Sequence, residues 1–238
     1  MAGNRARSTT PVARWLSIAK AGRYYTLGPD NGAGVREVWF VLHGYGQLAA
    51  SFIQYFGDLD DGTRRIIAPE ALNRFYLVTV DSAPASERPV GATWMTREDR
   101  EHEIADYVAY LDALHGTLVN ARSLAPKVVV IGFSQGAATA ARWAERGTAR
   151  IDHLVLWGGT VPPETEFTDG SNPLRGVPVT LVVGSRDQYM TPEVIARERL
   201  RFDNGGVPFR FIGFEGGHVV SRAAIRQLVS LLNEVPGR

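Results

Sequence analysis

Short apolar runs and helical periodicities alternate along the chain. The apolar runs, several of which end at a glycine, are Val38–Leu42, Phe75–Val80, Val128–Ile131, Leu154–Trp157, Val179–Val183 and Phe209–Phe214. Runs that are apolar on both faces are typical of parallel strands covered by helices on both sides. We therefore expect a central sheet that is buried on both of its faces.

Helical patterns lie between these runs. From Glu98 to about Ser123, apolar residues recur on one helix face, and Thr96 is the expected N-cap. Thr191-Pro192-Glu193 combines an N-cap, a proline at the first helical position and an acid near the positive helix end. A third helical pattern covers Val219–Val235. The alternation predicts an α/β fold with a mostly parallel sheet, right-handed crossovers and helices on both faces.

Composition narrows the class of protein. The 238 residues are 45% hydrophobic and 21% charged, which suits one domain over residues 21–238 after a loosely held, flexible arm over residues 1–20. A net charge of +1 with scattered arginines gives no sign of a nucleic-acid partner. The chain has no cysteine, which excludes a disulfide, a thiol nucleophile and a zinc site built on thiolates.

The apolar runs are also too short for a membrane anchor. None approaches the roughly 20 residues of a membrane span, and the basic N-terminus has no apolar run of signal-peptide length. We therefore expect a cytoplasmic protein without a stable membrane anchor. The sequence does not decide the oligomeric state, and a homodimer remains open.

The segment Gly132-Phe133-Ser134-Gln135-Gly136 matches the pattern G-x-S-x-G. It follows an apolar strand and precedes the alanine-rich stretch Ala137–Ala141, the strand–turn–helix context in which this pattern carries a nucleophile. The sharp turn exposes the serine hydroxyl, and a Cβ at either glycine position would clash. We predict that Ser134 is the nucleophile; an ordinary turn with a capping serine is the alternative.

His218 is the expected general base. In folds that carry a nucleophilic serine on such a strand–turn–helix, the chain order is serine, acid, histidine. Only His153 and His218 follow Ser134. His153 begins an apolar strand and so lies at the wrong end of the sheet, whereas His218 follows the carboxyl end of the last strand. We expect His102 and His115 to be solvated helix residues.

Asp187 is the expected acid, because it follows the strand Val179–Val183. Its carboxylate would accept the Nδ1 proton of His218, so that Nε2 is free to take the proton of the serine. Asp169 is the weaker candidate, since it lies in a stretch rich in proline, glycine and asparagine, far from any strand end. A helix-capping or turn role is the alternative for Asp187.

Acyl transfer also needs two fixed N–H donors that face the developing oxyanion. The amide of Gln135, next to the nucleophile, is the first candidate. The second is Tyr45 N–H, because His43-Gly44-Tyr45-Gly46 follows an early strand and its glycines let the backbone approach the substrate. We expect His43 to brace this loop by hydrogen bonds rather than to transfer protons.

Together these motifs resemble the carboxylesterase/lysophospholipase/acyl-protein thioesterase group of α/β-hydrolases. The matching segments are Leu42–Gly46 (L-H-G-x-G), Gly132–Gly136 (G-F-S-Q-G), Asp187, Gly217-His218 and the proline-containing Ala68–Ala71 after the second core strand. The resemblance spans residues 35 to 232 and implies a compact esterase with no large lid domain, no cofactor and no metal. It implies the triad Ser134, Asp187 and His218, with the amides of Tyr45 and Gln135 as oxyanion hole.

Three positions depart from the pattern of this group. Leu72 replaces a second proline, Gln47 replaces an acid after H-G-x-G, and Trp94-Met95-Thr96 only partly matches a Trp-Phe-Asp segment. These segments line the substrate entrance, so they bear on the substrate rather than on the chemistry. We expect Trp94 and Met95 to line the acyl pocket, with ordinary packing as the alternative.

The expected activity is hydrolysis of a small-molecule carboxylic ester with a short to medium acyl chain, through an acyl-enzyme. Thioesters and lysophospholipids run through the same intermediate, and the motifs do not separate them. A peptidase or an acyltransferase is a second hypothesis, and a non-catalytic ligand-binding protein on a hydrolase scaffold is a third.

Overall fold

The computed structural model describes residues 11–29, 34–78, 84–119, 126–167 and 170–234. Its elements in chain order are β1 (Tyr24–Leu27), β2 (Glu37–Leu42), α1 (Ala49–Phe52), the 3-10 helix η1 (Ile53–Leu59), β3 (Arg64–Pro69), β4 (Asn73–Tyr76), η3 (Ala85–Glu87), β5 (Val90–Thr93), α2 (Arg100–Leu118), β6 (Lys127–Phe133), α3 (Gln135–Arg146), β7 (His153–Trp157), η4 (Pro173–Gly176), β8 (Val179–Gly184), α4 (Pro192–Gly205), β9 (Phe209–Phe214) and α5 (Arg222–Asn233).

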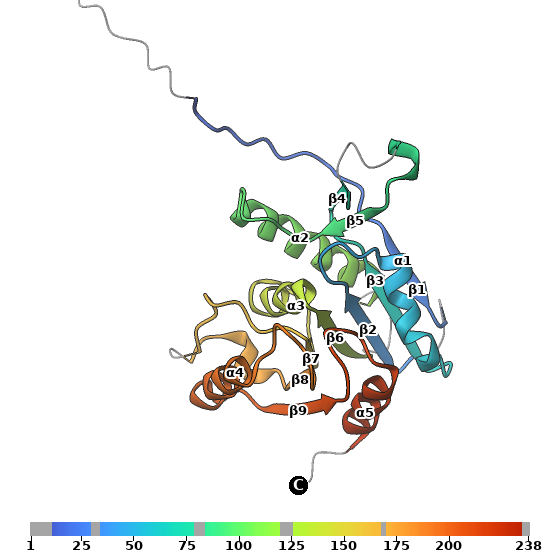
Figure 1. Cartoon of the computed structure of the whole chain (residues 1–238), viewed down its shortest axis with the longest axis vertical. Helices are drawn as coiled ribbons and strands as arrows, with labels where there is room; N and C mark the ends of the chain where they lie inside the picture. Colours follow the sequence, from blue (N-terminus) through green and yellow to red (C-terminus); the bar gives the residue numbers. More distant parts are fainter. Residues whose placement is uncertain (1–10, 30–33, 79–83, 120–125, 168–169, 235–238) are drawn as a thin grey trace, which may run out of the picture.

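A seven-stranded sheet in the order β1-β3-β2-β6-β7-β8-β9 forms the centre of the molecule (Figure 1). β1 runs antiparallel to β3, and every other neighbouring pair is parallel. The carboxyl ends of β2, β6, β8 and β9 therefore meet at one edge of the sheet, where ligand sites of such sheets lie. The predicted fold class, a mostly parallel α/β sheet without a large lid domain, is confirmed in the described residues.

The alternation of side chains along the strands divides the core between the two faces of the sheet. On β2, Val38, Phe40 and Leu42 belong to a core shared with α2, α3 and α4, while Trp39 and Val41 pack with α1, η1 and α5. Figure 1 shows these two groups of helices on opposite sides of the sheet. Both faces are covered, which explains why the strands are continuous apolar runs.

One predicted core strand is wrong. The run Phe75–Val80 was expected to enter the sheet, but β4 covers only Asn73–Tyr76 and pairs with β5 in a separate hairpin. Tyr76, Leu77 and Val78 are exposed, so this apolar run faces solvent instead of the core. Thr79 and Val80 lie outside the described residues. The strand that joins the sheet is β3. It begins with the charged residues Arg64 and Arg65, but the residues that follow are apolar and buried.

The helices match the sequence at their centres but not at every end. Thr191 caps α4 as predicted, since its side chain accepts from Val194 N–H. Thr96 does not cap α2: the helix begins after Asp99, which has a φ of 50° and makes no side-chain cap hydrogen bond. Thr96 Oγ1 instead accepts from Glu98 N–H in a turn that precedes the helix. The predicted helix end near residue 123 lies outside the described residues.

The described part of the N-terminal arm, residues 11–20, contains no helix or strand and is exposed. Trp15 stacks on His102 and donates its indole N–H to Asp99, so the arm contacts the start of α2. The flexibility of residues 1–20 and the single domain over 21–238 stay predictions. In the part of the chain that is described, no helix is long and apolar enough to cross a membrane. The cytoplasmic location stays a prediction as well.

His153 begins β7, at the end of the sheet opposite the carboxyl ends of the strands, as the sequence indicated. It is buried, and its Nε2 lies 2.8 Å from Thr180 Oγ1. Burial, followed by the charges of Lys127 and Arg210, lowers its pKa to about 4. In an unfolded chain the pKa of histidine is about 6.5. Between these two values the unfolded chain binds more protons, so stability falls as the pH falls.

We therefore expect His153→Gln, which keeps a polar partner for Thr180 but does not titrate, to lose less stability in acid than the wild type. Between neutral pH and about pH 5, the unfolding free energy of the variant is expected to fall by roughly 2 kcal/mol less than that of the wild type. Denaturant unfolding at neutral and acidic pH measures it. His102→Gln, at an exposed histidine, is the matched control and is expected to follow the wild type. An identical acid loss in wild type and His153→Gln would refute this explanation.

Candidate active site

Ser134 lies on the turn between β6 and α3. Its φ of 55° and ψ of −116° make it one of two described non-glycine residues with positive φ. Ser134 N–H donates to Trp157 O at 2.9 Å, so the neighbouring strand β7 holds the turn. A strained backbone that the surroundings fix is typical of a nucleophile on a strand-to-helix turn.

The two glycines of the motif are required by close backbone approach. A Cβ on Gly132 would lie 2.0 Å from Gly136 O, and a Cβ on Gly136 would lie 2.3 Å from Leu42 O. The first contact closes the turn, and the second presses the start of α3 against the end of β2. The glycines thus bring the serine next to the loop that follows β2.

His218 follows β9 and faces the serine. Its Nε2 lies 2.9 Å from Ser134 Oγ, within hydrogen-bond distance. The ring packs against Phe133 with centroids 4.9 Å apart and meets the edge of Tyr189 at 4.7 Å. These two aromatic rings fix the plane of the imidazole.

Asp187 lies in the turn after β8 and holds the other side of this histidine. Its Oδ2 accepts from His218 Nδ1 at 2.8 Å, and its side chain is 1% exposed. Its Oδ1 accepts from the backbone N–H groups of Tyr189, at 2.9 Å, and Met190, at 3.2 Å. With Nδ1–H directed at the carboxylate, Nε2 is the nitrogen that accepts the serine hydroxyl. Asp169 lies outside the described residues.

The loop after β2 carries the second expected oxyanion donor. Gly44 N–H donates to Gln47 Oε1, Gly46 N–H to Ala92 O, and Gln47 N–H to Gly44 O. Tyr45 N–H, in contrast, has no acceptor among the described residues, and the same holds for Gln135 N–H at the start of α3. A Cβ on Gly44 would lie 3.3 Å from Ser134 Cβ, so this loop runs directly beside Ser134.

His43 makes the bracing contacts that the sequence suggested. Its Nδ1–H donates to Gly44 O at 2.8 Å, and its Nε2 accepts from Ala71 N–H at 3.1 Å. The ring is buried, and burial lowers its pKa, so it stays neutral and keeps both contacts at physiological pH. Among the described residues, His43 makes no hydrogen bond to Ser134.

Trp94 and Met95 lie beside this loop. Trp94 is buried and donates its indole N–H to His43 O at 2.8 Å, so it also supports the oxyanion loop. The side chain of Gln135 holds this segment: its Nε2 donates to Met95 O at 2.8 Å and its Oε1 accepts from Trp94 N–H at 3.1 Å. Their role in the acyl pocket stays a prediction.

The sequence missed two buried polar groups. Glu70 is buried next to the oxyanion loop and binds Arg23 and Arg74 at 2.6 Å each. Burial alone would raise the pKa of Glu70, but the hydrogen bonds from the two arginines outweigh burial and lower it. His115, expected to be solvated, is buried against Phe40 and Trp143. The A-P-E-A segment marked the position of Glu70, and Arg74 lies four residues further on, but Arg23 is 47 positions away.

An exposed apolar surface lies on the same side as the triad. Tyr45, in the loop beside Ser134, packs its ring on Phe75 of the hairpin at 5.1 Å, and Leu77 lies against Gly46. Tyr189 and Val219, next to Asp187 and His218, are also largely exposed. No group of three or more potential metal ligands gathers within the described ranges.

A serine on a strained strand-to-helix turn, a histidine and a buried carboxylate at one edge of a parallel sheet define the class of the α/β-hydrolase-fold serine hydrolases. The profile of the family "Serine hydrolase (FSH1)" matches residues 38–226. The chain therefore belongs to the FSH1 serine hydrolase family. The resemblance to α/β-hydrolases inferred from the motifs is confirmed at this level.

Solved structures of esterases share the fold at low sequence identity. The chain is similar to esterase PE8 (TM-score 0.62, 21% identity, covering 91% of this chain and 100% of that one). It is also similar to Zea mays acyl-protein thioesterase 2 (0.66, 18%, 89% and 98%) and to a carboxylesterase from Mesorhizobium loti (0.64, 20%, 90% and 97%). A comparison with curated protein sequences found no match.

Proposed function

We propose that this hydrolase cleaves carboxylic esters through an acyl-enzyme on Ser134. The observation that carries the proposal is the continuous hydrogen-bonded chain from Ser134 Oγ to His218 Nε2, at 2.9 Å, and from His218 Nδ1 to Asp187 Oδ2, at 2.8 Å. A serine hydroxyl is a weak nucleophile until a base takes its proton, and this geometry supplies the base and its orienting acid.

In the acylation step, Ser134 Oγ attacks the carbonyl carbon of the ester while its proton passes to His218 Nε2. The negative charge that forms on the carbonyl oxygen is stabilised by the N–H groups of Tyr45 and Gln135. The C–O bond to the alcohol then breaks, and His218 gives its proton to the leaving oxygen. The products of this half-reaction are the free alcohol and the acyl ester of Ser134.

In the deacylation step, water takes the place of the alcohol. His218 Nε2 accepts a proton from the water, whose oxygen attacks the acyl carbon. The same two amides hold the oxyanion, and the serine leaves with the proton from the imidazole. Asp187 keeps its hydrogen bond to Nδ1 and stabilises the imidazolium that forms twice in each turnover.

The expected substrate is a small ester with a short to medium acyl chain. Tyr45, Leu77, Tyr189 and Val219 form an exposed apolar rim around the nucleophile, and Trp94 and Met95 lie behind the oxyanion loop. An apolar rim favours substrates whose acyl group is hydrocarbon. The esterase and acyl-protein thioesterase neighbours are consistent with both ester and thioester substrates, which form the same acyl-enzyme.

A substrate series tests this proposal. The purified protein is assayed with p-nitrophenyl esters from acetate to dodecanoate, with matched acyl thioesters, and with a lysophospholipid. We expect ester turnover whose kcat/KM rises over the first members, because each buried methylene contributes about 0.8 kcal/mol, and falls for long chains. Faster thioester or lysophospholipid cleavage would reassign the substrate, and binding without turnover would favour the non-catalytic alternative.

The oxyanion loop gives a prediction of its own. Tyr45→Phe removes only the phenol and keeps the backbone N–H, so kcat is expected to stay within about tenfold, or ~1.4 kcal/mol of barrier. Gly44→Val places a branched side chain where even a Cβ would lie 3.1 Å from Gln47 Oε1 and Phe133 Cδ1. This displaces the Tyr45 amide, and loss of one oxyanion donor costs about 10²–10³ in kcat.

The measurement is kcat of both variants on one small ester, with circular dichroism to establish that both fold. A loss in Tyr45→Phe as large as that in Gly44→Val would show that the phenol acts on the substrate or intermediate. The assignment of Tyr45 as a backbone donor would then be wrong.

A further inference from the structure

β9 is the last strand of the sheet and has a free edge. It pairs with β8 on one side, and no described strand lies on its other side. Its sequence, Phe-Arg-Phe-Ile-Gly-Phe, contains no proline and a single charge. Soluble proteins commonly protect such edges with prolines, charges or a covering loop, because an unpaired strand edge invites another strand.

The register of β9 shows which backbone groups are unpaired. Val179 N–H donates to Pro208 O, and Ser185 N–H donates to Phe214 O, so the backbone groups of the even-numbered residues face β8. Because these groups alternate along a strand, the N–H and C=O groups of Phe209, Phe211 and Gly213 face outward. The free edge thus offers a regular row of donors and acceptors.

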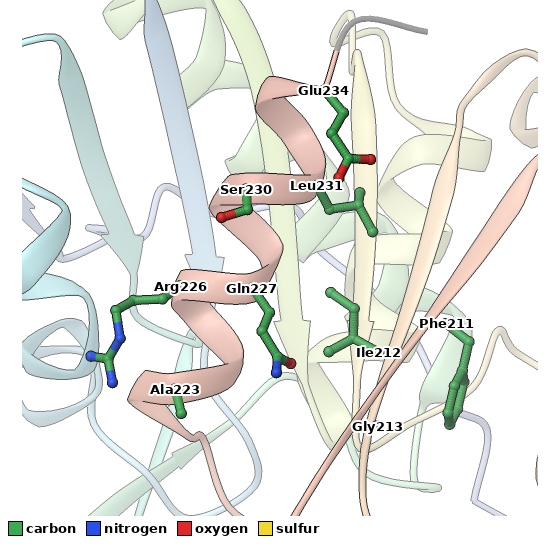
Figure 2. A pocket seen from close by; sticks show the side chains of 9 residues that line it. All are labelled: Phe211, Ile212, Gly213, Ala223, Arg226, Gln227, Ser230, Leu231 and Glu234. Carbon is green, nitrogen blue, oxygen red and sulfur yellow. The ribbon is translucent and has the colours of Figure 1, made fainter. Parts of the chain in front are cut away.

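A groove of about 610 Å³ runs between this strand and α5. Figure 2 shows α5 beside β9, with Gln227 and Leu231 extending from the helix toward the strand and Glu234 at the far end. Ser230 adds a hydroxyl to the lining. The groove therefore has polar groups, the guanidinium of Arg226 and one carboxylate beside the free edge.

We propose that β9 pairs antiparallel with β9 of a second copy of this chain, so that two sheets join into one across a two-fold axis. The axis passes beside Phe211, which forms a hydrogen-bonded pair with the partner's Phe211. Phe209 then lies opposite the partner's Gly213, and Gly213 opposite the partner's Phe209. All outward N–H and C=O groups of these three residues are satisfied in this register.

The side chains of β9 are self-complementary in this register. A Cβ on Gly213 would lie 3.3 Å from Phe211 Cε1, so the ring of Phe211 covers this side of the glycine, and the partner's Phe209, opposite Gly213, would meet that ring. Phe211 is 38% exposed, and Arg199 lies over its ring at 4.8 Å, which leaves the edge of the ring for a cross-strand aromatic contact.

The groove supplies charge complementarity on the other face. In an antiparallel pair centred on Phe211, a residue one position before Phe211 lies opposite the residue one position after it in the partner. The partner's Arg210 therefore lies opposite Ile212, at the groove. Its guanidinium reaches the side of α5 that carries Glu234, whose carboxylate is 3.4 Å from Arg210 of its own chain and 68% exposed. The dimer thus places one additional cation near each of two accessible carboxylates.

The other end of the sheet is the competing edge. β1 has four residues, and Tyr24 on it is exposed. β9 has six residues, so it offers the longer row of backbone hydrogen bonds, and aromatic side chains lie at both of its ends. Pairing through β9 leaves Ser134 accessible, because the triad lies beyond the carboxyl ends of the strands rather than at this edge. The proposal therefore does not depend on the identity of the substrate.

Sedimentation velocity over a range of protein concentrations tests the dimer. We expect the wild type to reach twice the 26.1 kDa mass of the chain. In Phe211→Glu the new carboxylate can pair with Arg199 in the monomer, but two glutamates lie opposite each other in the dimer. The dissociation constant is expected to rise about tenfold or more, since like charges directly opposite destabilise paired strands. Tyr24→Glu, the matched change at the β1 edge, is expected to leave it unchanged.

Gly213→Pro gives a second, independent variant, because proline removes an N–H that only the partner strand would use. It too is expected to favour the monomer, and retained turnover of a small ester shows that both variants are folded. A wild type that stays monomeric over the whole range would overturn the proposal. So would a dimer that is dissociated by Tyr24→Glu but persists in folded Phe211→Glu and Gly213→Pro.

Discussion

Ser134→Ala is expected to abolish ester hydrolysis, with a loss on the order of 10⁶ in kcat, as in other serine hydrolases that lose the nucleophile. Without Oγ no acyl-enzyme forms, and the hydrogen bond to His218 Nε2 disappears. The fold should persist, because alanine and serine have similar backbone preferences at the φ of 55° that this turn imposes. Binding of the substrate is expected to remain close to that of the wild type.

The measurement is kcat on the best ester of the series, together with the thermal unfolding temperature. Ser185→Ala is the matched control, since Ser185 also follows a strand of the sheet but bonds to Glu215 instead of the histidine. We expect its activity to stay near that of the wild type. Turnover by folded Ser134→Ala at the wild-type rate would refute the nucleophile assignment.

Asp187→Asn is expected to lower kcat by about 10⁴, the cost of the equivalent change in serine proteases. The structure gives the reason. Asp187 Oδ1 accepts from the N–H groups of Tyr189 and Met190, while Oδ2 accepts from His218 Nδ1. Asparagine has one oxygen, and if the backbone donors keep it, the amide NH₂ faces Nδ1.

An imidazole that faces an NH₂ group must carry its proton on Nε2, and then it cannot accept the proton of Ser134. The effect is therefore on kcat, with KM nearly unchanged, because the substrate does not contact this carboxylate. Asp169→Asn is the control from the weaker sequence candidate and should change little. If Asp169→Asn were the inactive variant instead, the acid would be misassigned.

The hydrogen-bond distances from His218 to Ser134 and to Asp187 depend on features that are visible in the sequence. Motifs that follow strands could be placed near one another from the sequence, because parallel strands bring their carboxyl ends to the same edge and so gather loops that are far apart in the chain. Ser134, Asp187 and His218 each follow an apolar run that becomes a core strand. Their residue types and order then indicated the chemistry.

Apolar runs alone did not distinguish the core from the surface. Phe75–Val80 is as apolar as the core strands, but Tyr76, Leu77 and Val78 are exposed near the active-site loop. Arg64–Pro69 begins with two charged residues and nevertheless occupies the sheet, since Arg64 pairs with Glu37 at its end. The hydrophobicity of a segment indicates its tendency to be buried, but whether that segment joins the sheet depends on the strand beside which it lies.

Buried polar groups were the least accessible from the sequence. Glutamate is mostly exposed in proteins and histidine is intermediate, but Glu70 and His115 are both buried here. The environment of Glu70 depends on Arg23, which is 47 positions away, and that of His115 depends on packing against Phe40 and Trp143. Such partners are set by the tertiary structure and leave no local pattern.

Covalent labelling with a fluorophosphonate tests the central claim most directly, because the probe reacts preferentially with an activated hydroxyl, which attacks phosphorus and expels fluoride. The account predicts one label per chain, located by peptide mapping on Ser134, absent in Ser134→Ala and slow to form in Asp187→Asn. A label on any other residue, or no label on the folded wild-type protein, would contradict the assignment of Ser134 as the activated nucleophile of this hydrolase.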